Sequence, residues 1–212
     1  MKTSDLIRAL AADSAPPPKP LRRVFQAALP PAIVAAFALY LAFLGPRPDL
    51  MAHLAEPRFA FKFILVLLLM GLAGDLVLRV GQPGAPTRAS ASRLWIIPVL
   101  VGGAILAELL VLPPHLWLPR LIGHNALPCL VSIPCLSLGP LAAIFFSLRQ
   151  GAPDKPALAG AAAGVFAAAI GAVLYATHCP DDSPLFVAAW YTLAIAFVAG
   201  MGALAGARLL RW

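Results

Sequence analysis

The sequence predicts an all-α polytopic membrane protein, a bundle of six transmembrane helices joined by short loops. Hydrophobic residues make up 61% of the 212 positions and charged residues only 12%, whereas soluble domains are about half apolar and about a quarter charged. Six stretches reach the length of about 20 mostly apolar residues that a membrane-spanning helix needs. The predicted spans are Val24–Leu44, Phe59–Leu78, Leu94–Leu112, Cys129–Leu148, Leu158–Ala176 and Phe186–Ala207.

The distribution of Lys and Arg predicts which side each loop faces. Twelve of the sixteen lie in the amino-terminal tail, the second and fourth loops and the carboxyl end, and only three lie in the opposite loops. Because short loops rich in Lys and Arg stay in the cytoplasm, both termini are expected there, with the protein in the bacterial inner membrane. The fifth loop then faces the periplasm. The twelve are Lys2, Arg8, Lys19, Arg22, Arg23, Arg79, Arg88, Arg93, Arg149, Lys155, Arg208 and Arg211.

The chain is expected to divide into a cytoplasmic tail, residues 1–23, and a transmembrane domain, residues 24–212. The tail begins MKTSDLIRALAAD, where Thr3 or Ser4 can cap a short helix. Leu6, Ile7 and Leu10 fall on one face of that helix, and the segment SAPPPKP should hold it away from the membrane. So short a helix gains order by docking into a partner's groove; the alternative is a frayed tail on anionic lipid.

Small residues predict which spans pack closely. Gly160 with Gly164, and Gly202 with Gly206, each form a GxxxG pattern that lets helix backbones approach one another. The fifth and sixth spans are therefore expected to be close partners. The alternative is that these glycines line a transport path.

The three cysteines all fall toward the outer half of the predicted bundle. Cys129 and Cys179 lie at the outer boundary, whereas Cys135 lies six residues further along the fourth span, about 9 Å deeper. That distance is too long for a disulfide, so geometry permits a Cys129–Cys179 pair and excludes a Cys129–Cys135 pair. The outer compartment is oxidising, so the permitted pair can form a disulfide.

The segment YATHCPDDSPLF, residues 175–186, places polar groups between two apolar stretches. Cys179 lies beside His178 and close to Asp181–Asp182, with His124 in the facing loop. Thiolate and imidazole groups bind soft and borderline metals. Three interpretations stay open: a metal or redox sensor, a structural disulfide, or tolerated polar loop residues. The candidate metal ligands are Cys129, Cys179, His178 and Asp181.

The end of the same segment also fits the start of a helix. Ser183 can cap the sixth span, and Pro184 suits its first turn. The acidic residues before Ser183 are therefore compatible with a structural role.

Charged residues inside the spans are costly unless they are paired or face a wet cavity. Lys62 and Asp75 lie near the ends of their spans and can snorkel, and Glu108 lies near the outer end of the third span. A small transporter is one alternative, but an ion path needs more groups at mid-depth. A membrane thiol oxidoreductase is another, but it needs a second redox pair. No nucleophile elbow, phosphate loop or HExxH motif is present, so we expect no enzyme.

Four stretches, in this order, are typical of one family. They are the MKTSDLIRALAAD start, Cys129 at the head of the fourth span, LRQGAPDKPALAGAAAG into the fifth, and YATHCPDDSPLFVAAWY followed by the LLRW end. With them the chain resembles the NrsF-like membrane negative regulators, which are anti-sigma factors of extracytoplasmic-function sigma factors. The stretches cover both ends of the chain and most of its second half.

The resemblance implies a cytoplasmic segment that sequesters a sigma factor at the membrane, and two outer cysteines that respond to heavy metal or oxidant. The sensing pair is then Cys129 and Cys179, the latter displayed as a reactive thiol. Its reaction is expected to shift the fourth and sixth spans and move the first span or its tail. No cofactor is expected beyond a transient heavy-metal ion, and no direct binding of nucleic acid. The implied sigma-binding residues are Asp5, Leu6, Ile7, Arg8 and Leu10.

Overall fold

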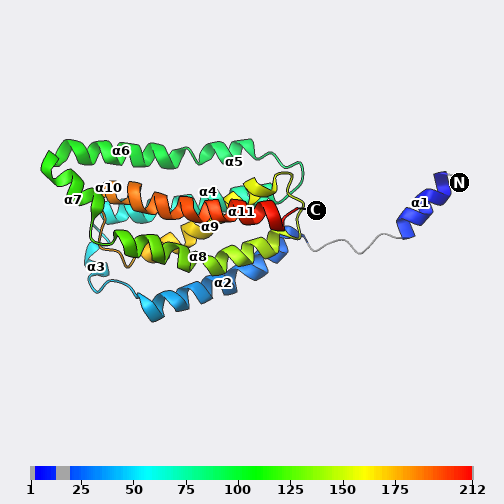
Figure 1. Ribbon diagram of the computed structural model, residues 1–212, viewed down its shortest axis with the longest axis horizontal. Coiled ribbons are helices and arrows are strands. Elements are labelled where there is room, and N and C mark those ends of the chain that lie inside the picture. The colour runs from blue at the N-terminus through cyan, green and yellow to red at the C-terminus, as the bar shows by residue number, and fades with distance from the viewer. Residues whose placement is uncertain (1–2, 13–19, 212) are drawn as a thin grey trace.

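The predicted all-α fold is confirmed: every regular element in the described part of the chain is helical. The computed structural model describes residues 3–12 and 20–211, so most of the predicted SAPPPKP spacer lies outside the described residues. Figure 1 shows the long helices side by side in one elongated bundle. Six helical stretches are long and apolar enough to cross a membrane.

Two short helices accompany the first three stretches: α3 lies between the first and the second, and α5 begins the third. The predicted third span is longer than expected and is interrupted near Leu94, where α5 ends before α6 begins. The elements are α2 (Leu21–Phe43), α3 (Leu50–His53), α4 (Pro57–Val80), α5 (Arg88–Arg93) and α6 (Ile96–Val111).

The last three stretches contain most of the buried residues. The fourth includes, near its start, a short helix with no buried residues, and the sixth contains a π-helical turn, Val187–Tyr191, which is a helix irregularity often found at functional sites. Ser183 and Pro184 do begin the sixth stretch as predicted. The elements are α7 (Trp117–Ile122), α8 (Ala126–Leu148), α9 (Pro156–Ala176), α10 (Pro184–Phe186) and α11 (Thr192–Leu209).

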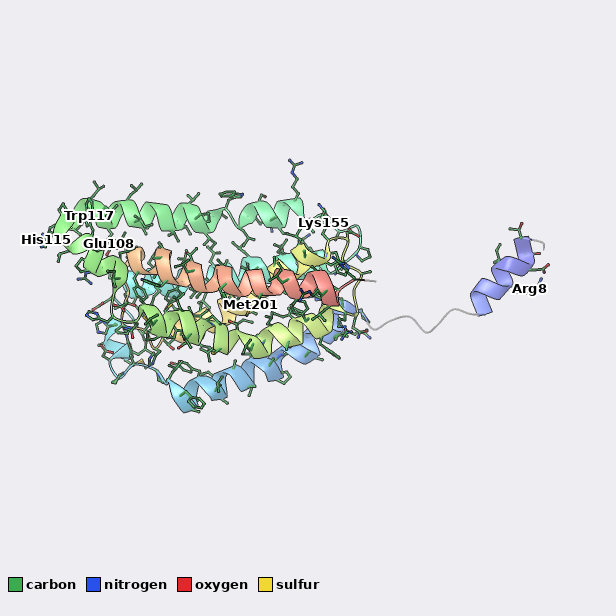
Figure 2. The ribbon with its side chains drawn as sticks, in the orientation of Figure 1. Arg8, Glu108, His115, Trp117, Lys155 and Met201 are labelled. Atoms are coloured by element: carbon green, nitrogen blue, oxygen red, sulfur yellow. The ribbon has the colours of Figure 1, made fainter. Side chains whose placement is uncertain are left out.

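The amino-terminal residues form α1 (Thr3–Ala12), as the sequence predicted. The side chains of Ile7 and Arg8 are exposed, while those of Leu6 and Leu10 lie outside the described residues. Figures 1 and 2 draw α1 apart from the bundle. Its Asp5 lies in the first turn, where a negative charge favours the helix.

The two ends of the bundle differ in charge. At one end, here called the basic end, lie the start of α2, the start of α9 and the carboxyl terminus (Figure 1). The opposite end, here called the loop end, holds α3, α7 and the start of α10. The first and last spans thus begin and end on the same side. The described basic residues at the basic end are Arg22, Arg23, Arg79, Arg88, Arg93, Arg149, Lys155, Arg208 and Arg211.

Helix α9 is the centre of the bundle, packed against α4, α8 and α11. Its close approach to α11 depends on glycine, because a Cβ on Gly160 would meet backbone atoms of Gly202 and Gly206, and a Cβ on Gly164 would meet the carbonyl oxygen of Val198. The predicted packing of the fifth and sixth spans is therefore confirmed. By contrast Gly103 faces open space on α6, a peripheral helix whose only buried residue is Glu108.

Replacing Gly160 with Leu should destabilise the bundle by about 3 kcal/mol or more, because the atoms it meets are backbone and cannot rotate away. Gly103→Leu is the matched control. A Cβ there meets nothing within 4 Å, so the thermal unfolding midpoint of this variant should stay near that of the unmodified protein. Thermal unfolding in detergent, followed by circular dichroism, measures both. Equal midpoints for the two variants would contradict the packing described above.

Candidate functional site

The candidate site is the loop of residues 177–183, which connects α9 to α10 at the loop end. Three hydrogen bonds tie the start of this loop to the end of α2 and the residues after it. Tyr40 Oη and Thr177 Oγ1 lie 2.6 Å apart, and the Arg47 amide donates to the Thr177 carbonyl oxygen at 3.1 Å. His178 Nδ1 lies 2.9 Å from the Gly45 carbonyl oxygen. A shift of this loop would therefore change the hydrogen bond that holds the carboxyl end of α2.

Two cations hold the end of the loop through one carboxylate. Lys62 Nζ forms an ion pair with Asp182 Oδ1, and it donates to the Cys179 carbonyl oxygen at 2.8 Å. Arg47 Nη1 donates to Asp182 Oδ2 at 3.0 Å. The Arg47 guanidinium carbon also lies 5.0 Å from the centre of the Phe59 ring, a distance at which a cation is attracted to the ring face.

The placement of Lys62 decides between two possibilities. The sequence allowed Lys62 either to snorkel toward the membrane surface or to be paired, and its side chain is 0% exposed and points into the protein. A buried ammonium without a partner is very unfavourable. The pairing with Asp182 is therefore a structural requirement for both groups.

Glu108, which Figure 2 labels near the loop end, ties the peripheral helix α6 to the same loop. Its Oε2 accepts a hydrogen bond from the Ser183 hydroxyl at 2.7 Å and another from the Leu185 amide at 3.1 Å. Ser183 was a candidate cap for its own helix, yet its side chain makes no such bond. Instead the Glu108 carboxylate accepts one of the free amides at the start of α10.

Asp181 fastens the loop to the start of α8. Its Oδ2 accepts hydrogen bonds from the amides of His124 and Asn125, at 3.0 and 2.9 Å, and from the Asn125 side-chain amide at 3.0 Å. These donors lie just before the first residue of α8. A carboxylate at a helix start also interacts favourably with the helix dipole.

The two predicted sensing thiols lie in the same buried cluster, beneath this polar network. Cys129 in α8 and Cys179 in the loop are both 0% exposed, and neither forms a disulfide. Tyr175 and Tyr191 pack beside them, with ring centres 6.1 Å apart. Their hydroxyl groups are buried and have no hydrogen-bond partner among the described residues. Polar atoms left unpaired in this way are uncommon and often mark a functional site.

Burial raises the pKa of the Cys179 thiol above its ordinary value. The expectation that the loop displays a reactive thiol is thus wrong for this structure: Cys179 is covered and is a neutral thiol at physiological pH. Cys135, which was predicted not to pair with Cys129, is exposed on another face of α8.

The covered thiol predicts slow alkylation. Each unit by which the pKa rises lowers the thiolate fraction about tenfold, and burial adds a steric barrier. A water-soluble maleimide should therefore modify Cys179 at neutral pH at least about tenfold more slowly in the folded protein than in the chain unfolded in dodecyl sulfate. The rate should rise with pH. Peptide-level mass spectrometry measures the modification at Cys179 separately; equal rates in both states would show that the thiol is accessible.

The predicted metal ligands do not converge in this structure. Within residues 3–12 and 20–211, no three His, Cys, Asp or Glu side chains are placed to hold a metal ion. Of the four candidates, Cys129 and Cys179 share a cluster, whereas His178 and Asp181 bind backbone groups of other segments. Metal binding at these residues stays a prediction, and it would require the loop to open.

A pocket gives solvent a route toward the loop. It has a volume of about 290 Å³ and lies against the loop residues that follow Cys179. A ligand bound there would contact the Asp181 and Asp182 carboxylates, which hold the loop closed. Its lining residues are Pro119, Arg120, Gly123, His124, Pro180, Asp181, Asp182 and Ser183.

Two charged groups considered for an ion path lie at opposite ends of the bundle. Glu108 lines a pocket of about 270 Å³ between α4 and α6 at the loop end. Asp75 accepts hydrogen bonds from Arg79 and Ser90 near the basic end. Both carboxylates are paired; Glu108 is buried, whereas the Asp75 side chain is 38% exposed.

Sequence reasoning missed the roles of Arg47, Lys62 and the two tyrosines. Lys62 was noted as a charge in an apolar stretch, but no pattern linked it to Asp182, which lies 120 positions away. The one signal in the sequence was that a charged residue in an apolar stretch needs an oppositely charged partner. Tyr175 and Tyr191 carry no motif, and only the fold places them beside the thiols.

Comparison with known proteins identifies the family. The profile of the family described as negative regulator of sigma F matches residues 10–212. The chain belongs to this family. The negative regulators of sigma F include the anti-sigma-F factor NrsF of Caulobacter vibrioides, which is 39% identical to this chain over 221 residues that cover all of both proteins. The resemblance inferred from the sequence is thus confirmed.

A second relative gives the same result. The probable anti-sigma-F factor NrsF of Azospira oryzae is 36% identical over 214 residues, again with both chains covered in full. No solved structure matches this member of the family.

Proposed function

We propose that this negative regulator of sigma F is a membrane-bound anti-sigma factor that holds its sigma factor on the cytoplasmic side through the amino-terminal segment. The observation that carries the proposal is the family match over nearly the whole chain. The exposed side chains of Ile7 and Arg8 on α1 are available to a partner. The sigma factor is expected to be of the extracytoplasmic-function class, with α1 docking in a groove of that protein.

On the other side, we propose that Cys129 and Cys179 sense heavy metal or oxidant in the periplasm. The loop of residues 177–183 covers both thiols, and its carboxylates also line the adjacent pocket. A soft metal ion would bind the thiolates and displace the two protons. Because this requires an open loop, the signal stabilises the open conformation over the closed one, which is the condition for a switch.

Helix α2 is the proposed connection between the two sides. Its carboxyl end is hydrogen bonded to the loop through Tyr40, and its first residue, Leu21, follows α1 in the sequence. One continuous helix thus joins the loop end to the basic end. Opening of the loop releases the end of α2, and the sigma factor is freed as α2 shifts.

The binding experiment uses the intact chain and a version lacking residues 2–15, each purified in detergent and used to capture sigma factors from extracts of the host. The intact chain should retain a sigma factor and the truncated chain should not, since the deletion removes all of α1. Ile7→Asp should weaken capture without shortening the chain. The bundle should unfold at the same temperature in the intact chain, the truncated chain and Ile7→Asp, because these changes lie outside the bundle.

Addition of cadmium to the captured complex tests the signal. Release of the sigma factor from the intact chain supports the proposal. Capture of a sigma factor by the truncated chain would place the sigma-binding surface elsewhere in the protein. If neither chain captures a sigma factor and the truncated chain still carries out transport or electron transfer, the protein is a transporter or a thiol oxidoreductase instead.

A further inference from the structure

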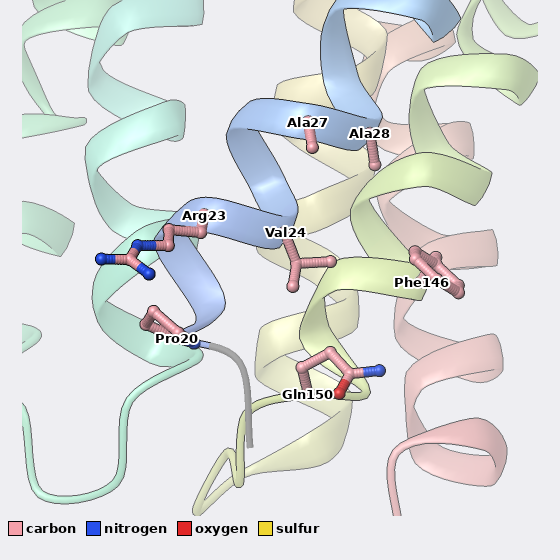
Figure 3. Close-up of a pocket in the computed structure, with 7 residues that line it drawn as sticks. All are labelled: Pro20, Arg23, Val24, Ala27, Ala28, Phe146 and Gln150. Atoms are coloured by element: carbon pink, nitrogen blue, oxygen red, sulfur yellow. The ribbon is translucent and has the colours of Figure 1, made fainter. Parts of the chain in front are cut away.

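A second site lies at the basic end, far from the cysteines. A groove of about 840 Å³ runs between the start of α2 and the end of α8; binding sites for small molecules have volumes of about 300–1,000 Å³. Figure 3 shows Val24, Ala27 and Ala28 of α2 on one side and Phe146 and Gln150 on the other. The short side chains of the two alanines leave this space unfilled.

The lining changes from apolar to polar along the groove. Val24, Ala27, Ala28 and Phe146 lie within the membrane-spanning stretches, whereas Gln150 follows the end of α8 and Arg23 lies in the first turn of α2. A matching ligand has an apolar chain at membrane depth and a polar head at the surface. Membrane lipids have this composition.

The charge at the rim selects among lipids. Arg23 is exposed, lines the groove and makes no ion pair with any acidic group of the described residues. Figure 3 shows its guanidinium beside Pro20, directed away from Phe146 and Gln150, so the side chain must turn toward the groove to reach a head group. Arg22 and Arg149 are exposed at the same end. Basic clusters between transmembrane helices bind anionic head groups, and a guanidinium matches a phosphate well.

We propose that this groove binds one anionic glycerophospholipid. An acyl chain lies along Val24, Ala27, Ala28 and Phe146, and the phosphate is bound by Arg23. The proposal does not depend on sigma binding or on the cysteines. It places a lipid at the start of α2, next to the segment that carries α1.

Charge complementarity also argues against a second copy of the chain as the occupant of the groove. A second copy of the chain packed symmetrically on the same groove would bring two Arg23 side chains together. An anionic lipid neutralises the rim instead.

Native mass spectrometry of the full chain in detergent tests the proposal, with dioleoylphosphatidylglycerol and dioleoylphosphatidylcholine as probes. The unmodified protein should bind phosphatidylglycerol more tightly. Arg23→Gln should lower that affinity about fivefold, because a Lys or Arg near the surface contributes about 1 kcal/mol toward an anionic lipid. Ala28→Trp should fill the groove and lower the affinity for both lipids.

Matched variants control for charge and bulk. Arg208→Gln removes a basic residue at the same end that does not line the groove, and Ala38→Trp adds a large side chain to an exposed position of α2 outside the groove. Both should bind lipid as the unmodified protein does. Glycerol 3-phosphate alone should not compete, since it lacks the acyl chain.

Three outcomes would overturn the proposal. The first is equal binding of the two lipids, and the second is equal loss in Arg23→Gln and Arg208→Gln. The third combines two results: phosphatidylglycerol binding increases when residues 2–15 are deleted, and it is unchanged in Ala28→Trp. Together these results would assign the groove to α1. None of these readings involves a sigma factor, so this proposal can fail while the proposed function stands.

Discussion

Asp182→Asn should destabilise the protein by about 3–5 kcal/mol, the cost of removing one partner from a buried ion pair. Asp182 neutralises the fully buried Lys62 and also accepts a hydrogen bond from Arg47. The asparagine has nearly the same shape but no charge. The Lys62 ammonium then remains buried without a counter-charge, so the loop of residues 177–183 is held less firmly against α4.

A double-mutant cycle separates this pair from a general effect of mutation. Lys62→Met alone leaves Asp182 with Arg47, and Lys62→Met with Asp182→Asn removes both members of the buried pair. The double variant should be clearly more stable than the sum of the two single effects predicts. Unfolding by denaturant in detergent, followed by circular dichroism, gives the four free energies of unfolding.

Asp49→Asn is the matched control at the same end of the bundle. Asp49 also lies near Arg47, at 3.6 Å, but its side chain is 54% exposed. Exposed ion pairs contribute about 0–1 kcal/mol, so this variant should unfold close to the unmodified protein. If Asp49→Asn and Asp182→Asn cost the same, the buried pair does not hold the loop.

Replacing Cys129 and Cys179 together should abolish the response to heavy metal. The two thiols are the soft ligands within the covered cluster, and serine oxygens bind cadmium poorly. Transcription from a sigma-dependent reporter should stay at its uninduced level when cadmium is added to cells that carry the double variant. The unmodified protein should release its sigma factor and induce the reporter many fold.

The third cysteine provides the control. Cys135 is exposed on another face of α8, so Cys135→Ser should respond as the unmodified protein does. Because a serine hydroxyl is costly when buried without a partner, the double alanine variant is tested beside the double serine variant. Induction by cadmium in a folded double variant would show that the signal is sensed elsewhere.

The loop geometry couples these two predictions. Asp182 lies three positions after Cys179, and Lys62 contacts both residues, one through its carboxylate and the other through its carbonyl oxygen. A loop that is released by Asp182→Asn should expose the thiol. The maleimide experiment on Asp182→Asn should therefore show faster modification of Cys179 than in the unmodified protein.

The sequence was sufficient to predict the spans and the contact between the fifth and the sixth. A backbone in lipid must form its own hydrogen bonds, so long apolar stretches can only be helices. The start of the sixth span at Pro184 follows from the preference of Pro for the first helical turn, and the contact of α9 with α11 follows from glycines at helical spacing. All of these are properties of neighbouring residues. The interruption near Leu94 and the π-helical turn in the last span carried no signal of this kind.

Only the tertiary structure decided how the candidate site is built. The sequence by itself determined that Cys129 and Cys179 lie on one side of the bundle, because each is adjacent to a loop that faces that side. Whether these thiols are displayed or covered depends on Lys62, Glu108 and Asp182, which belong to three different elements. Contacts between elements depend on where whole helices pack, and a buried charge finds its partner in space, at no fixed spacing along the chain.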